Sequence, residues 1–152
     1  MALPSIFDES VSAQIINRIN SLNPQTAASW GKMNVAQMLA HCNVTYEMIY
    51  ETKHPKPNFF MRLVLKAFVK KIVVTEAPYK PNSPTAPTFL IVDERVFEIE
   101  KNRLIQYISK TQQLGASFFD NKASLSFGKL STNQWNNMLY KHLNHHLSQF
   151  GV

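Results

Sequence analysis

Two of the five histidines in this chain, His142 and His146, are four residues apart near its end. On an α-helix this spacing places both side chains on one face, with their Cβ atoms about 5–6 Å apart. Two imidazoles arranged in this way can bind one transition-metal ion, because each offers a nitrogen lone pair that forms a bond of about 2.0–2.1 Å. A third ligand has to come from elsewhere in the chain, and His41 is the best candidate.

His142 and His146 lie on the inward stripe of a predicted C-terminal helix over residues 132–150, together with Trp135 and Leu139. Both imidazoles are therefore expected to face the interior of the fold, where a buried ring nitrogen needs a partner. That partner can be a metal ion, a backbone carbonyl or a water molecule. The spacing alone leaves these alternatives open.

His41 lies on the flank of the apolar stripe of a second predicted helix, over residues 34–52. We expect this position to bring it towards a neighbouring helix, where it can act as the third ligand. Three imidazoles from two helices leave at least one coordination position open to water or substrate, which is typical of catalytic metal sites. Leu143 follows His142, so the glutamate base of the His-Glu-x-x-His metalloproteases is absent.

Three further residues are candidates for contacting these ligands or lining the pocket beside them. Thr45 lies on the same side of the second helix as His41, and Gln149 follows His146 on the inward stripe. His145 lies about 100° round the helix from His146, which predicts a position at the rim of the site.

The positions of these residues depend on a predicted all-α architecture. We expect helices over residues 8–22, 34–52, 59–73, from 88–93 to about 114, and 132–150. Four prolines between residues 78 and 87 interrupt regular structure, and loops of this length are often functional. Because strong strand patterns are missing, the sequence predicts a four-helix bundle with one extra short helical segment and a long proline-rich loop.

Length and composition are those of a cytoplasmic protein with one domain. The 152 residues, 45% of them apolar, can form a single core over residues 1–152. Cys42 is the only cysteine, so a disulfide framework is excluded, and we expect it to pack as a small apolar residue. The sequence shows no signal-peptide pattern and no stretch of about 18 apolar residues that could cross a membrane.

The net charge of +6 indicates a second feature, a basic segment between Lys53 and Lys80. Arg62, Lys66 and Lys70 recur at every fourth residue and form one stripe on the predicted third helix. This stripe can be the solvated face of an amphipathic helix. The alternative is a non-catalytic binding module that docks on an anionic membrane or partner through residues 59–74. The sequence contains no nucleic-acid-binding motif, so we expect no nucleic-acid partner.

Several parts of the chain resemble the DinB/YfiT-like superfamily, and more closely an uncharacterised DinB-like subfamily of small bacterial proteins. The most specific part is the histidine pattern, formed by the helix of His41 after the run Trp30–Asn34 and by the C-terminal run Tyr140–Gly151. The segments Asn82–Phe89 and Phe127–Leu130 are also similar to that subfamily.

The resemblance implies a four-helix bundle in which His41, His142 and His146 hold a divalent metal. We expect nickel or zinc, but imidazole ligands also suit iron or copper, so the identity of the metal stays open. Some relatives are thiol-dependent transferases or isomerases that use a low-molecular-weight thiol such as bacillithiol or mycothiol. The resemblance therefore implies a metal-dependent S-transferase or hydrolase with a small-molecule substrate. A homodimer would be consistent with the family.

Overall fold

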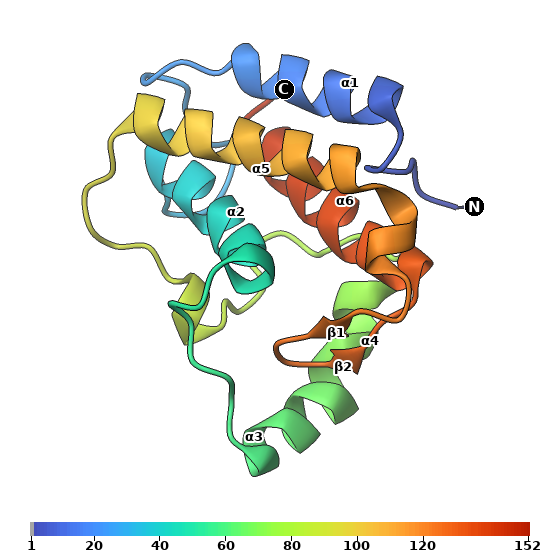
Figure 1. Cartoon of the computed structure of the whole chain (residues 1–152). Helices are drawn as coiled ribbons and strands as arrows, with labels where there is room; N and C mark the ends of the chain where they lie inside the picture. The colour runs from blue at the N-terminus through green and yellow to red at the C-terminus, as the bar shows by residue number, and fades with distance from the viewer. Residues whose placement is uncertain (1) are drawn as a thin grey trace.

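The computed structural model describes residues 2–152 and is built mainly of packed helices (Figure 1). The long helices are α1 (Glu9–Asn20), α2 (Val35–Tyr50), α5 (Phe97–Phe119) and α6 (Thr132–Gln149). Within the described residues the only strands are β1 (Ala123–Ser124) and β2 (Gly128–Lys129), which pair antiparallel in a small hairpin. The prediction of an all-α bundle is confirmed.

The core forms where the apolar stripes of the four long helices meet. Helix α5 contacts α1, α2 and α6, and α2 also contacts α6. The space between α2, α5 and α6 is filled by side chains that have almost no solvent exposure. They are Met38, Leu39 and Tyr46 of α2, Leu104 and Ile108 of α5, and Leu139 and Leu143 of α6. This core fixes α2 beside α6, the two helices that contain the candidate histidines.

Capping boxes determine where these two helices begin. The side chain of Asn34 accepts from the amide of Gln37, whose own side chain accepts from the amide of Asn34. Ser131 and Gln134 make the same reciprocal pair at the start of α6. Each box satisfies two backbone donors that have no partner within the helix. Both helix starts agree with the sequence prediction.

Helix α5 differs from its predicted range at both ends. It begins at Phe97, after residues that continue the extended path of the proline-rich loop, and Val96 before it is still extended. It continues past Gly115, where a kink with φ of 73° interrupts the helical conformation, and ends at Phe119. The buried ring of Phe119 packs against Phe7 and Trp135, and this packing holds the last turn in place.

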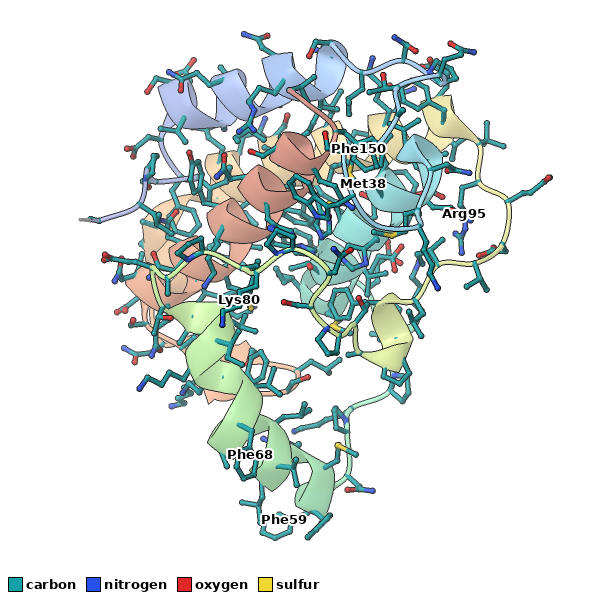
Figure 2. All side chains as sticks on the ribbon, turned by 180° about the vertical axis from the view of Figure 1, so that it is seen from behind. Met38, Phe59, Phe68, Lys80, Arg95 and Phe150 are labelled. Atoms are coloured by element: carbon teal, nitrogen blue, oxygen red, sulfur yellow. The ribbon has the colours of Figure 1, made fainter. Side chains whose placement is uncertain are left out.

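Residues 59–74 form an arm that projects from one end of the bundle (Figures 1 and 2). It consists of α3 (Phe59–Val64), a π-helical turn η1 (Leu65–Val69) and α4 (Lys70–Val74). Val74 is the only residue of the arm that is fully buried. The apolar residues of an ordinary amphipathic helix would be covered by the core, whereas most of those in the arm are exposed.

The base of the arm is attached to α6 through backbone carbonyls near the end of α4. The buried ammonium group of Lys141 donates to the carbonyl oxygens of Ile72, Thr75 and Ala77 at 2.7, 2.6 and 3.0 Å. Carbonyls at a helix C-terminus lack partners within the helix, so the lysine supplies donors to the end of α4 and to the residues that follow it. The amide of Asn137 donates to the carbonyl of Val74 at 3.0 Å.

Candidate metal centre

The structure brings together the three histidines that the sequence singles out. His41 lies in the middle of α2, and His142 and His146 lie one turn apart on α6. One ring nitrogen from each lies within 4.8 Å of the other two, and the Nε2 atoms of His41 and His142 are 2.9 Å apart. His41 and His146 are buried and His142 is half-buried.

Hydrogen bonds on the outer side of the cluster fix the proton positions of two rings. The Nδ1 atom of His41 lies 2.8 Å from the carbonyl oxygen of Phe89. A carbonyl oxygen only accepts, so Nδ1 holds the proton and the Nε2 lone pair of neutral His41 faces the cluster. The Nδ1 atom of His146 donates in the same way to Oε1 of Gln149 at 2.8 Å. Gln149 itself donates from Nε2 to the carbonyl of Trp30 at 2.6 Å, which fixes the orientation of its amide.

His142 completes the set with a hydroxyl behind it. Its Nδ1 atom is 3.2 Å from Oγ1 of Thr45, while its Nε2 atom faces that of His41. The Thr45 hydroxyl can donate to Nδ1, in which case the Nε2–H group of His142 donates to the Nε2 lone pair of His41. When Nδ1 donates to Thr45 instead, two Nε2 lone pairs face each other, and a cation could bind between them. A hydrogen-bond partner behind each imidazole is the arrangement that orients histidine ligands of metals.

The separations of the nitrogen atoms suit one ion. Two nitrogens bound at about 2.1 Å around a tetrahedral ion are about 3.4 Å apart. The distance of 2.9 Å between His41 and His142 is close to this value, and the third nitrogen lies within 4.8 Å. The three nitrogens are therefore close enough together that one ion could be bound by all of them.

Burial keeps these imidazoles neutral. Loss of hydration lowers the pKa of His41 and lowers that of His142 well below its ordinary value, and the neighbouring imidazoles lower both further. Burial lowers the pKa of His146 to about 3, with a further decrease caused by His41 and with Gln149 acting in the opposite direction. Neutral imidazole is the form that binds a metal, so the three rings are in the form that could bind an ion at physiological pH.

The proline-rich loop forms a wall of the centre. It ends in η2 (Pro87–Phe89), and the ring of Phe89 lies 5.4 Å from that of His41 and 6.1 Å from that of His142. Tyr79, from the start of the loop, places its ring 6.5 Å from that of His142, edge-on. The sequence indicated a loop of the length that is often functional, but it did not identify Phe89 or Tyr79 as neighbours of the histidines. The spacing of the prolines shows where the loop begins and ends, but it does not show the path that the loop takes.

His145 lies beside the cluster and faces a neighbouring cavity. Its ring is 5.9 Å from that of Trp30 and 5.6 Å from that of Tyr79. These three residues, with Pro81, Asn144 and Ser148, line a cavity of about 200 Å³. Burial lowers the pKa of His145, so it is also neutral at physiological pH. None of the three clustered histidines lines this cavity, which borders the cluster through His145, whose ring lies 5.0 Å from that of His146.

The fold and the cluster together define a helical bundle with an internal three-histidine site that can hold a metal. Residues 8–151 match the family described as "Protein of unknown function (DUF1569)", and the chain belongs to this family. The family is grouped with the DinB/YfiT-like proteins, in agreement with the resemblance noted in the sequence. A search of curated proteins and a search of solved structures found no match. Within residues 2–152, none of the helices has the length and apolar character needed to cross a membrane.

The stability of the metal-free protein should depend on pH. Burial holds the pKa of His146 at about 3, whereas unfolding restores a value of about 6.5. Between these values the unfolded state binds more protons, so the free energy of unfolding falls as the pH decreases below about 6.5. After chelation, we expect the thermal midpoint measured by circular dichroism to fall by more than about 5 °C between pH 7 and pH 5.

The matched variant for this measurement is His142→Leu/His146→Leu, which removes two of the titrating groups and leaves the interior apolar. Its thermal midpoint should change less over the same pH range. An equal pH dependence in the variant would show that other groups cause the effect.

Proposed function

We propose that the protein binds a divalent transition-metal ion through the Nε2 atoms of His41, His142 and His146. The observation that supports this proposal is the convergence of three neutral imidazoles whose Nδ1 atoms each have a partner on the far side. Imidazole ligands suit both zinc and nickel, which we take as the candidate ions. A set of three protein ligands leaves coordination open for a further group.

The enzymatic part of the proposal is a thiol-dependent S-transferase or a hydrolase that acts on a small molecule. When bound, the ion would act as a Lewis acid and lower the pKa of a coordinated thiol or water. The protein's own contribution is to hold the three imidazoles and to cover them with Phe89 on the loop side. The cavity lined by Trp30, Tyr79 and His145 is the proposed place for the substrate.

Removal of the α6 ligands tests the metal site directly. Untagged protein incubated with zinc or nickel and then desalted should retain about one ion per chain by elemental analysis. His142→Ala/His146→Ala should lose nearly all of this ion, because a single imidazole from α2 remains.

His54→Ala is the matched control, because His54 pairs with Glu47 away from the cluster. This control should keep the metal. Equal metal contents in the wild-type protein and the double variant would remove the three-histidine site from consideration.

Cobalt substitution distinguishes the two proposed chemistries. If a thiol occupies the open coordination, adding 2-mercaptoethanol to the cobalt-loaded protein at neutral pH should produce a sulfur-to-cobalt charge-transfer band, since a coordinated thiol is deprotonated. The same addition to His142→Ala/His146→Ala should produce none. Absence of the band from the loaded wild-type protein would contradict the thiol-dependent route and leave hydrolysis as the proposed reaction.

Gly31 provides a test that changes none of the ligands. A Cβ atom at this position would lie 2.6 Å from Nε2 of Gln149, and Gly31 has a φ of +86°. Gly31→Ala should therefore displace Gln149, remove the support behind His146 and weaken metal affinity about tenfold or more in a competition titration.

Gly115→Ala is the control, because Gly115 also has a positive φ, +73°, but nothing lies within 4 Å of the added Cβ. It shares the backbone strain of the first variant and should keep the affinity. Equal losses in both variants would show that strain, and not the position of Gln149, determines the result.

A further inference from the structure

The arm exposes an unusual amount of apolar surface. Phe59, Phe60 and Phe68 are 76%, 73% and 72% exposed. Three aliphatic side chains of the arm are also largely exposed, namely Met61, Leu63 and Ile72. Single exposed apolar residues are ordinary, but six of them within residues 59–72 indicate a surface that is covered in use. Figure 2 shows Phe59 at the tip of the arm, away from the bundle.

The arm and the residues that lead into it contain a strong positive charge. Residues 52–75 include six basic residues and no aspartate or glutamate: Lys53, Lys56, Arg62, Lys66, Lys70 and Lys71. Their sum equals the net charge of the whole chain, +6. No ion pair among residues 2–152 neutralises Lys66, Lys70 or Lys71. The charge of these three lysines is therefore available to an external anionic partner, whereas Lys53 pairs with Glu47 and Glu51.

We propose that the arm docks on the surface of an anionic lipid membrane. Its exposed phenylalanine and aliphatic side chains would enter the boundary between headgroups and acyl chains, and its lysines would contact lipid phosphates. Helices that lie in a membrane interface combine these two features. This inference concerns a surface outside the metal centre and does not depend on the proposed metal chemistry.

The charge and the apolar residues together favour lipid over other partners. A second copy of the chain would bring two arms of equal positive charge together, which is unfavourable. Single-stranded nucleic acid stacks on aromatic rings, but it would leave Met61, Leu63 and Ile72 without a matching apolar partner. An anionic membrane provides phosphate for the basic groups and hydrocarbon for all six apolar side chains.

The shape of the molecule allows docking without rearrangement of the core. The arm projects beyond the bundle in both views, so its tip can reach a flat surface first (Figures 1 and 2). Its base stays attached to α6 through Lys141 and the carbonyls near the end of α4. The exposed lysine of the hairpin, Lys129, lies next to Gly128, which the Lys66 side chain approaches from the arm. The basic surface thus continues from the arm onto the bundle.

Vesicle flotation tests the proposal with the full chain. The protein should float with vesicles of phosphatidylcholine containing about one-third phosphatidylserine, and about tenfold less with pure phosphatidylcholine. Binding should weaken strongly at about 0.5 M salt, because salt screens the attraction. Phe59→Ser/Phe60→Ser should reduce binding about tenfold or more and leave the thermal midpoint unchanged, because both side chains are exposed.

The matched control is Val92→Ser/Ile99→Ser, which removes two apolar side chains that are 86% and 56% exposed and lie outside the arm. This variant should bind vesicles like the wild-type protein. The proposal is overturned if the wild-type protein does not float with anionic vesicles or if both variants lose vesicle binding equally. It is also overturned if the arm variant only converts a dimer to a monomer in sedimentation, which would make a second copy the occupant.

Discussion

The structure around the centre depends on one constraint, which is that a buried imidazole needs partners on both ring nitrogens. Each of the three histidines meets this need on its outer side with a group from a different part of the chain. The carbonyl of Phe89 comes from the proline-rich loop, the hydroxyl of Thr45 from α2, and the amide of Gln149 from the end of α6. The inner nitrogens are then left to one another, which is an arrangement that one shared cation would satisfy.

This constraint explains why segments outside the bundle are ordered around the centre. Gln149 accepts from His146 while its own side-chain amide donates to the carbonyl of Trp30, and the backbone amide of Ser29 donates to the backbone carbonyl of Gln149 at 2.8 Å. The proline-rich loop reaches His41 with a backbone carbonyl, and prolines limit the conformations that the unfolded loop can adopt. The loop can therefore be placed at a smaller entropic cost.

The sequence was sufficient for the features that depend on local spacing. The four-residue step from His142 to His146 predicted a shared helix face, and the starts predicted for the helices over residues 34–52 and 132–150 agree with those of α2 and α6. It could not identify Phe89 as a partner of His41, because every residue has a carbonyl and only the path of the loop selects one. Likewise, the periodic pattern of residues 59–73 predicted a helix, but periodicity does not show whether another part of the same chain covers its apolar side. In the arm, most of the apolar side chains are not covered by any other part of the described chain.

Helix α6 contributes residues to the centre and also holds the base of the arm, and the charge of Lys141 affects both. Lys141 directly precedes the candidate ligand His142, and an unscreened ammonium group there would oppose the binding of a divalent cation. Three carbonyl oxygens surround its Nζ atom at 2.6–3.0 Å, and Nζ also lies 4.5 Å from the centre of the Tyr79 ring. The negative ends of these dipoles and the ring face partly offset the charge. One lysine thus holds the base of the arm and the wall of the centre while its charge is directed into backbone acceptors.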